Sequence, residues 1–333
     1  MKVSRRGFIE RGSLTTTIAG IGLAGCTEDE GTTLTLGHAV GSEFVPIGTF
    51  SERVAQRVSE RTDGDVEIEV HPGGELGTSV EHIEGVSSGT IDMTVEPHDL
   101  LDSRFGVLAF PFLYEDYQEM MTKTNPYESD VAQELNQESI DEFDFRALTY
   151  LPSGNRTVQI AGEKVCTPED LEDRVMRSPE SEYFISMIEG LGAETTSIDF
   201  AEVSSALATG SVDGVEFYIG VTHAAGLFEQ LDAIARTNHT QYPMVCGINE
   251  ASWQDLTNEQ QEVLIEVTEE ERQTSAENLV DDEERVLDIA EEEGLVVEGM
   301  DGCLDREAFR EPCQANMLDA FPEWEERVDR LRD

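Results

Sequence analysis

Arg177 is the side chain in this sequence best suited to hold an anion. It follows Val175 and Met176, which favour a short strand, so we expect Arg177 at a strand's carboxyl end. Open α/β sheets bind ligands at such ends. A guanidinium offers paired planar donors that match a carboxylate, and exclusion of water strengthens each bond. The alternative is a structural ion pair with one of the many acidic side chains nearby.

The elements around Arg177 predict a parallel α/β arrangement. Thr167 can cap a short helix that begins at Pro168, with Asp170 at the capping-box position. Apolar residues then recur at helical spacing, and glycines end the helical stretches. Strands that alternate with helices favour a parallel sheet. The later elements of this segment are predicted as helices over 183–191 and 200–209 and a strand over 212–217.

The rest of the chain alternates strands and helices in the same way. Strands are predicted over 33–38, 65–71, 91–96, 105–110, 143–150 and 295–297. Helices are predicted over 46–61, 78–88, 257–293, and 306–332 with breaks at Pro312 and Pro322. The helix over 257–293 has Thr257 and Gln260 in capping-box positions and is unusually long for a globular protein.

Several spaced motifs occur in the order that a known family shows. They are Thr-Pro-Glu-Asp-Leu at 167–171, Met-Arg at 176–177, Leu-Gly-Ala at 191–193, and Glu-Val-x-x-Ala-Leu-x-x-Gly-x-Val-Asp-Gly-Val-Glu at 202–216. The chain thus resembles the DctP-like solute-binding proteins of tripartite ATP-independent periplasmic (TRAP) transporters. Similar pieces outside this segment extend the resemblance over roughly 33–270, at 72–77, 89–92, 110–113 and 238–240.

The resemblance implies a two-lobed, periplasmic-binding-protein-like α/β fold. Hinge segments near 152–154 and 238–242 would join the lobes, and the long helix would span both. Domain I would comprise 33–153 with about 243–282, and domain II 154–242 with about 283–333. The chain would then be a receptor that closes on a small organic acid, such as a 2-oxo or hydroxy acid or a dicarboxylate, and delivers it to membrane permease subunits.

The resemblance also implies roles for individual side chains. Arg177 would bind the ligand's carboxylate, Arg156 would also touch the ligand, and Glu75 would face the cleft from the first lobe. His38 ends a strand and could face the cleft as well, although a satisfied wall histidine is the simpler interpretation. For Arg156 and Glu75 the alternatives are a structural ion pair and a solvated turn residue.

Phe217 departs from the family pattern. Many members have Asn-Pro after Asp-Gly-x-Glu, whereas this chain has Phe217 and Tyr218, and an aromatic ring cannot replace the hydrogen bonds of an amide. The pair formed by Glu216 and Phe217 is similar to that of a branch that binds 2-oxo acids together with a cation, in which Glu216 would help hold the metal. Two ordinary strand residues are the alternative. The identity of the ligand therefore stays open, and a C4-dicarboxylate is no longer the default expectation.

The composition is strongly acidic. The sequence has 71 acidic and 22 basic residues, for a formal net charge of −49, and its hydrophobic content of 38% permits a core. Nucleic acids and anionic bilayers need basic patches, so binding to either by charge is excluded. A protein that has so many acidic residues and can still form a core is typical of organisms whose cytoplasm contains multimolar salt. This composition suggests a haloarchaeal-type protein.

The first 25 residues resemble an export signal. Ser-Arg-Arg-Gly-Phe at 4–8 is a twin-arginine motif, and the apolar stretch 14–23 is too short to span a membrane. Leu-Ala-Gly-Cys at 23–26 indicates lipoprotein cleavage before Cys26. Residues 26–32 would form a lipid-anchored tether, and we expect the mature protein on the outer face of the cytoplasmic membrane.

The other cysteines predict one disulfide. Cys166, Cys246, Cys303 and Cys313 form an even set for an oxidising compartment, and Cys303 and Cys313 lie close in sequence, so we expect these two to pair. No C-x-x-C motif occurs, and the histidines show no metal-ligand spacing.

Catalysis is not expected. The Gly-Val-Ser-Ser-Gly at 85–89 matches the G-x-S-x-G of serine hydrolases, but it joins a helix to a strand rather than a strand to a helix. We expect no cofactor, apart from a possible cation beside the ligand. The alternatives are a secreted hydrolase on the same fold and a receptor for a peptide, sugar or metal.

Overall fold

The computed structural model describes residues 31–42 and 46–332, and Gly31–Asp333 form one compact unit. The export signal, Cys26 and most of the predicted tether lie outside the described residues. Within the described part, no helix is both long enough and apolar enough to cross a membrane.

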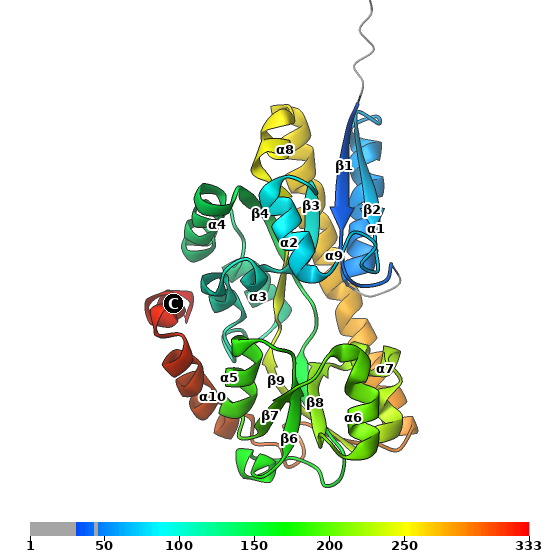
Figure 1. Ribbon diagram of the computed structural model, residues 1–333, viewed down its shortest axis with the longest axis vertical. Coiled ribbons are helices and arrows are strands. Elements are labelled where there is room, and N and C mark those ends of the chain that lie inside the picture. Colours follow the sequence, from blue (N-terminus) through cyan, green and yellow to red (C-terminus); the bar gives the residue numbers. More distant parts are fainter. Residues whose placement is uncertain (1–30, 43–45, 333) are drawn as a thin grey trace, which may run out of the picture. The chain divides into compact units, whose positions relative to one another are not determined.

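The described strands form two mixed sheets, which Figure 1 shows with most of their helices. The first has the order β2-β1-β3-β10-β4 and the second the order β11-β9-β5-β8-β6-β7. The strands of the first sheet are β1 (Thr32–Gly37), β2 (Val66–His71), β3 (Met93–Pro97), β4 (Phe145–Pro152) and β10 (Pro243–Asn249). Those of the second are β5 (Arg156–Ile160), β6 (Val175–Ser178), β7 (Glu194–Ser197), β8 (Gly214–Tyr218), β9 (Ala233–Thr240) and β11 (Val296–Glu298).

The sheets are only partly parallel, which corrects the sequence prediction. Strand β10 runs antiparallel to β3 and β4, and β5 runs antiparallel to β8 and β9. A strand that follows a helical crossover runs parallel to the strand before it. Strands β5 and β10 instead enter directly from the other sheet, after residues 153–155 and 241–242. These are the two crossings expected from the sequence, whereas the domain boundaries stay a prediction.

The helices that were predicted from sequence lie close to their predicted positions, whereas α7 and α8 were not predicted. The α-helices are α1 (Ile47–Arg61), α2 (Ser79–Ser88), α3 (Tyr117–Lys123), α4 (Asp130–Phe143), α5 (Glu182–Gly190), α6 (Val203–Thr209), α7 (Ile219–Ala224), α8 (Glu250–Asp255), α9 (Asn258–Glu292), α10 (Arg306–Ala320) and α11 (Glu325–Arg332). The 3₁₀ helices are η1 (His98–Leu100), η2 (Ser103–Ala109), η3 (Pro168–Leu171), η4 (Phe200–Glu202), η5 (Leu227–Gln230) and η6 (Pro322–Trp324).

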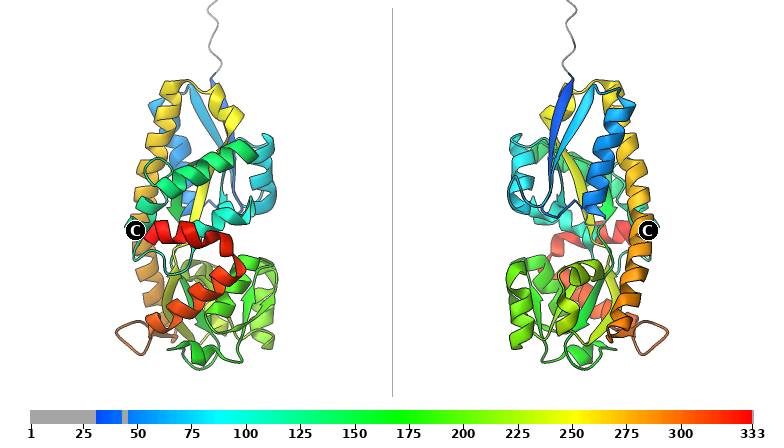
Figure 2. Two further views of the ribbon diagram at one scale, coloured as in Figure 1. Left: turned by 90° about the vertical axis from the view of Figure 1, so that its left-hand side faces the viewer. Right: turned by 90° about the vertical axis from the view of Figure 1, so that its right-hand side faces the viewer.

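Helix α9 connects the two sheets. It begins with the predicted capping box, in which the Thr257 side chain accepts from the Gln260 N–H and the Gln260 side chain accepts from the Thr257 N–H. The helix packs on β4 of the first sheet and on β11 of the second, and Figure 2 shows it running past both. A helix of this length is thus held by two separate packing surfaces rather than by a coiled-coil partner.

The apolar core fills the space between each sheet and its helices. In the first sheet Leu34 and Leu36 of β1 are buried, and α1, which packs on β2, buries Val54 and Val58 at helical spacing. Spacing of this kind identified most elements correctly from sequence, since it marks the face that must leave water.

Three element predictions need correction. Residues 105–110 lie largely in the buried 3₁₀ helix η2 rather than in a strand, because a short apolar run fits either conformation once it is buried. Strand β7 was not located from sequence, since its polar Glu194–Ser197 shows no buried alternation. Pro312 does not break α10: the helix loses one backbone donor there, while Phe309, Cys313 and Met317 stay fully buried on one face.

The predicted Cys303–Cys313 disulfide is wrong. The bond joins Cys166 to Cys303 across 137 residues of sequence, with their Cα atoms 5.3 Å apart. Cys313 is instead buried on α10, where its Sγ lies 3.6 Å from the carbonyl of Met187. Proximity in sequence misled the prediction. Cys303 lies in the loop before α10 and reaches Cys166, whereas Cys313 lies within α10 and faces Met187.

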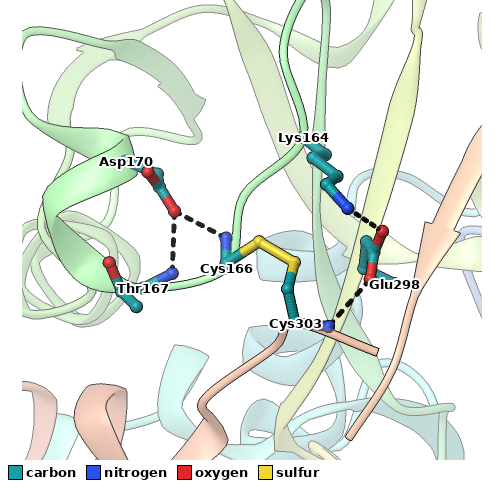
Figure 3. The surroundings of a disulfide bond; sticks show 6 residues. All are labelled: Lys164, Cys166, Thr167, Asp170, Glu298 and Cys303. Atoms are coloured by element: carbon teal, nitrogen blue, oxygen red, sulfur yellow. Dashed lines mark hydrogen bonds and ion pairs between the residues drawn. A yellow bond between two sulfur atoms is a disulfide. The ribbon is translucent and has the colours of Figure 1, made fainter. Parts of the chain in front are cut away.

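Hydrogen bonds hold both arms of the disulfide, as Figure 3 shows. Asp170 accepts from the N–H groups of Cys166 and Thr167, at 2.8 and 2.9 Å. On the other side Glu298 accepts from Lys164 and from the N–H of Cys303, at 2.5 and 3.1 Å. The bond therefore ties the loop before α10 to the capped turn of η3.

Candidate functional site

One edge of the second sheet brings the predicted site residues together. Strands β6 and β8 are parallel, so their carboxyl ends lie at the same edge, and Arg177 pairs in register with Val215, one residue before Glu216. Strand β5 is antiparallel to β8, so its first residue, Arg156, pairs with Tyr218 at that edge. The topology thus gathers two arginines and a glutamate that are distant in sequence.

Arg177 is a buried cation without an acidic partner among the described residues. Only 7% of it is exposed, and its Nε donates to the carbonyl oxygen of Ile198 at 2.8 Å. Its guanidinium carbon lies 5.2 Å from the ring centre of Phe217. Burial, followed by the positive charge of Arg156, lowers the pKa of Arg177 to about 10. An anion on its terminal nitrogens would relieve this cost of burial.

Arg156 is neutralised by Glu216. Its Nε and Nη2 donate to the two carboxylate oxygens of Glu216 at 2.6 and 2.8 Å, and Nη2 also donates to the Glu216 carbonyl at 2.8 Å. The guanidinium packs on the ring of Phe184, 4.7 Å from its centre. This is the two-pronged geometry that makes arginine–carboxylate pairs strong. The structural ion pair considered from sequence is therefore present at Arg156, whereas the structure shows none for Arg177 among the described residues.

Glu216 also receives a hydrogen bond from His239, a residue to which sequence analysis gave no role. Nε2 of His239 lies 2.9 Å from Oε1 of Glu216, and its Nδ1 lies 2.8 Å from the hydroxyl oxygen of Thr237. Burial opposes ionisation of Glu216, but the charge of Arg156 and the hydrogen bond from His239 outweigh it and lower its pKa to about 2. Glu216 is thus an anion at neutral pH.

Phe217 packs against the guanidinium of Arg177. It does not offer the hydrogen bonds that an asparagine at this position would offer to a ligand. Its ring lies beneath the guanidinium, and Phe200 of η4 meets the same ring edge-on, with centres 5.7 Å apart. Phe217 is 6% exposed while Phe200 is 51% exposed. The aromatic residue that departs from the family pattern therefore forms a cation–π contact that orients Arg177.

The metal role considered for Glu216 competes with existing contacts. Both of its carboxylate oxygens already accept from Arg156 or His239. Within 31–42 and 46–332 no cluster of three or more His, Cys, Asp or Glu is placed to hold a metal ion. A cation that arrived with a ligand would have to displace one of these donors.

His38 lies at the corresponding edge of the first sheet, directly after β1. It is fully buried, and neither ring nitrogen has a hydrogen-bond partner among the described residues. Burial lowers its pKa, although the nearby Glu96 opposes the shift. Glu96 itself accepts from the Ala39 N–H at 2.8 Å and lies 2.9 Å from Nδ1 of His82. The role of His38 at the cleft therefore stays a prediction.

Glu75 lies in the glycine-rich turn after β2. Its side chain is 66% exposed and its Oε2 is 3.5 Å from Nδ1 of His71. Gly73 and Gly74 have positive φ values of 68° and 76°, which explains why this turn needs glycine. No described contact joins Glu75 to either arginine, so its role stays a prediction.

Comparison with known proteins places the chain in a family. The model of the family described as bacterial extracellular solute-binding protein, family 7 (DctP) matches residues 36–322. This protein belongs to the DctP family. The 2,3-diketo-L-gulonate-binding periplasmic protein YiaO of Escherichia coli is 28% identical over 281 residues, which cover 82% of this chain and 84% of that protein. A solute-binding protein of Roseobacter denitrificans is 25% identical, over 86% and 87% of the two chains.

Solved structures share the fold of this DctP-family protein. A TRAP periplasmic solute-binding protein of Roseobacter denitrificans with bound 3-deoxy-D-manno-oct-2-ulosonic acid has a TM-score of 0.80 at 22% identity, covering 91% of this chain and 99% of the other. One from Sulfitobacter with bound β-D-galacturonate has a TM-score of 0.78 at 23% identity, covering 90% and 99%. The fold is thus the periplasmic-binding-protein-like fold of TRAP solute-binding proteins, and the named relatives are binding proteins rather than enzymes.

The sequence of this DctP-family protein located Arg177, Arg156, Glu216 and Phe217, which the structure brings to one edge. It missed His239, because no motif marks a histidine that contacts a glutamate 23 residues away. The available signal was its place in the Asn-His-Thr motif at 238–240, at the crossing back to the first sheet.

Proposed function

We propose that this DctP-family protein is the extracytoplasmic receptor of a TRAP-type transporter and captures a small organic acid. The observation that supports this most directly is the buried Arg177, which lacks an acidic partner among the described residues although the chain has 71 acidic residues. With Nε bonded to Ile198, the two terminal nitrogens remain for one carboxylate, which they match in spacing.

In this proposal the ligand lies between the facing edges of the two sheets. Arg177 and Arg156 stand at one edge and His38 at the other, and the short segments 153–155 and 241–242 and the long helix α9 cross between the sheets. A ligand that contacts both edges favours their approach, because it binds the closed arrangement better than the open one. The predicted domains, 33–153 with about 243–282 and 154–242 with about 283–333, would be the moving lobes.

The relatives favour a sugar acid as the ligand. YiaO is named for 2,3-diketo-L-gulonate, and solved structures of the same fold contain galacturonate, glucuronate and galactonate. All of these acids combine one carboxylate with several hydroxyl or carbonyl oxygens. Such a ligand would present an anion to Arg177 and polar oxygens to the edge of the first sheet.

The test is calorimetric titration of the mature protein with paired acids and neutral sugars, in high salt. D-glucuronate is compared with D-glucose, and D-galacturonate with D-galactose. We expect binding of at least one acid and none of its neutral counterpart. Equal affinity for an acid and its neutral sugar would contradict the proposal and favour a sugar receptor.

The hydrolase alternative has less support. Ser87, the central serine of Gly-Val-Ser-Ser-Gly, lies within the last turn of α2, and its hydroxyl donates to the carbonyl of Phe143 at 2.7 Å. Its hydroxyl is thus engaged as a donor and has no histidine beside it among its described hydrogen bonds. Release of product from p-nitrophenyl acetate that Ser87→Ala abolishes would restore that alternative.

We also propose twin-arginine export and lipid anchoring at Cys26, on the sequence patterns described above. Replacement of Cys26 by Ser removes the atom that would be lipidated, so the variant should be released into the medium while the wild type stays with the membrane. A Cys26→Ser protein that remains membrane-bound to the same extent would show that the anchor lies elsewhere.

A further inference from the structure

The carboxylate of Glu283, in α9, binds the crossing segment 153–155. Its Oε1 accepts from the N–H of Asn155 at 2.6 Å, and its Oε2 accepts from the Asn155 side-chain amide at 2.9 Å. Oε1 also accepts from the hydroxyl of Tyr117 at 2.6 Å, and Tyr117 begins α3, which packs on β4 of the first sheet. Asn155 directly precedes Arg156, the first residue of β5. One carboxylate therefore joins α9, a helix beside the first sheet and the segment that leads into the second.

The preceding residue of α9, Asp282, contacts the same segment indirectly. Its Oδ2 accepts from the hydroxyl of Tyr218, the last residue of β8, at 2.8 Å. The ring of Tyr218 lies against Gly154, so closely that a Cβ atom at Gly154 would be 2.1 Å from Cδ2 of the ring. Gly154 also has a φ of 118°, which side chains rarely adopt. Two successive residues of α9 thus fix one crossing segment, through Asn155 and through Tyr218.

Glu283 makes its hydrogen bonds without an ion pair among the described residues. Its donors are two amide N–H groups and a hydroxyl. Burial raises the pKa of its carboxyl, although the hydrogen bonds from Tyr117 and Asn155 and the charge of Arg236 oppose the shift. The next residue, Glu284, is exposed, and its side chain has no hydrogen bond in the described part of the chain. Bonds to the crossing segment therefore distinguish Glu283 from its acidic neighbour.

The connections between the two sheets meet near Glu283. The N–H and the hydroxyl of Ser153 both donate to the carbonyl of Tyr242, at 3.3 and 2.8 Å, so the two crossing segments are bonded to each other. Helix α9 packs on both sheets and is bonded to the first crossing segment through Asn155. A rotation of one sheet against the other has to be absorbed where the chain passes between them.

We propose that Glu283 is a positioning residue for ligand capture: by bonding Asn155 to α9, it fixes the point about which the two sheets turn and holds Arg156 in place. The effect on binding rests on the proposed function, whereas the effect on the two sheets can be measured without a ligand. No described contact joins Glu283 to Arg177, so it acts through Asn155 and does not need to touch the ligand.

Two substitutions separate the hydrogen bonds of Glu283 from its charge. Glu283→Leu removes every acceptor and keeps a residue that favours helix. Glu283→Gln removes the charge but keeps an oxygen that can accept from the N–H of Asn155 and from Tyr117. Glu284→Leu is the matched control, because it makes the same change one residue further along α9, on an exposed side chain.

The first measurement is the distance between two spin labels in the ligand-free protein, in high salt. The labels are attached at Glu84→Cys on α2 and Ala208→Cys on α6, which are exposed positions beside the first and the second sheet. The free thiols Cys246 and Cys313 are buried. We expect the distance distribution of Glu283→Leu to be roughly 1.5-fold broader than that of wild type, because the turning point is no longer fixed. Glu283→Gln and Glu284→Leu should match wild type.

The second measurement is calorimetric titration of the same variants with the acid that binds wild type most tightly. The affinity of Glu283→Leu should fall by about five- to tenfold, since binding must then also order the crossing segment. Glu283→Gln should restore most of it. If no acid binds wild type, the proposed function fails, and the distance measurement still decides the role of Glu283.

A wild-type distance distribution in Glu283→Leu would overturn the inference, whatever the melting temperature. A merely structural role lowers stability without changing how the sheets are arranged. A Glu283→Gln protein as broadly distributed as Glu283→Leu would also overturn it, because the charge would then matter and not the hydrogen bonds. If Glu283→Leu does not fold, Asn155→Ala takes its place, since it removes the 2.9 Å bond. Broadening in that variant supports the proposal, and an unchanged distribution overturns it.

Discussion

Two arginines at one sheet edge differ in role because their neighbours differ. Arg156 has a buried carboxylate with two short hydrogen bonds, whereas Arg177 has a backbone carbonyl and an aromatic ring. A buried guanidinium without a counter-ion is costly, and this cost supports the proposal that Arg177 binds an anionic ligand. Glu216 accepts two hydrogen bonds from Arg156 and thereby neutralises it, whereas no carboxylate does so for Arg177 among the described residues.

Glu216 should contribute to stability in a pH-dependent way. Its pKa falls from 4.5 to about 2 on folding, so its contribution is present above pH 4.5 and is lost as pH falls towards 2. The full shift corresponds to roughly 3 kcal/mol, of which about 2 kcal/mol disappears between pH 7 and pH 3. Urea unfolding of wild type and Glu216→Gln at both pH values, at constant salt, measures this loss.

The control for that comparison is Glu75→Gln. Glu75 is 66% exposed, so its replacement should change the free energy of unfolding little at either pH. The difference between wild type and Glu216→Gln should therefore shrink on acidification while the control stays flat. A Glu216→Gln difference of equal size at pH 7 and pH 3 would show that Glu216 is not held as a buried anion.

At the scale of elements, the Cys166–Cys303 disulfide fixes the loop before α10 to η3. Because it closes 137 residues, its loss frees the unfolded chain considerably and should lower the free energy of unfolding by about 2 to 4 kcal/mol. Denaturant unfolding of Cys303→Ser against wild type measures the change. Cys246→Ala, which removes a buried free thiol from the other sheet, shows the effect of losing a cysteine without losing the bond.

The pairing itself is checked by peptide mapping under non-reducing conditions. We expect a linked pair of peptides containing Cys166 and Cys303, with Cys246 and Cys313 as thiols. A peptide in which Cys303 is linked to Cys313 would restore the prediction made from sequence spacing and refute the pairing described here.

The elements show why the sequence predicted most, but not all, of the fold. Periodic apolar residues predict helix α1, and a capping box marks the start of helix α9. Both are local signals in the sequence. Strand order, the reversed directions of β5 and β10 and the Cys166–Cys303 bond depend on contacts between distant segments. Local patterns cannot specify such contacts. Strand β7 was missed because its polar residues give no apolar alternation.

The same limit applies to the candidate site. Family motifs located Arg177, Arg156 and Glu216, but nothing in the sequence indicates that Glu216 neutralises Arg156 and not Arg177. That distinction depends on strand register: Arg156 pairs with Tyr218 on the neighbouring strand, two residues from Glu216. The role of His239 was missed for the same reason, because its hydrogen bond with Glu216 joins strand β9 to strand β8.

At the scale of the whole molecule, the dominant feature is the net charge of −49. Ion pairs such as Arg61 with Glu266 join α1 to α9 and weaken slightly in salt. Since 71 acidic residues face only 22 basic ones, most carboxylates lack a cation, and repulsion outweighs these pairs.

Folding should therefore be more stable in salt. The screening length shrinks from about 10 Å at 0.1 M to about 3 Å at 1 M, so repulsion between surface carboxylates weakens. We expect the melting temperature to rise between these concentrations of potassium chloride. Sucrose at matched osmolality controls for solute exclusion, and a melting temperature that is unchanged by salt would contradict the account.

Ligand binding should survive the same conditions. A buried guanidinium–carboxylate pair is screened much less than exposed charges, and salt also weakens the long-range repulsion between an anionic ligand and the acidic surface. The central claim can thus be tested under conditions in which the protein is most stable.

The most direct test is calorimetric titration of Arg177→Ala, in high salt, with the acid that binds wild type most tightly. Arg174→Ala is the matched control, since it removes the same charge just before the opposite end of β6. Loss of one partner of a buried charged pair costs about 3 to 5 kcal/mol, so the affinity of Arg177→Ala should fall by roughly two to four powers of ten, while Arg174→Ala binds like wild type. A folded Arg177→Ala protein that binds within threefold of wild type would contradict the account.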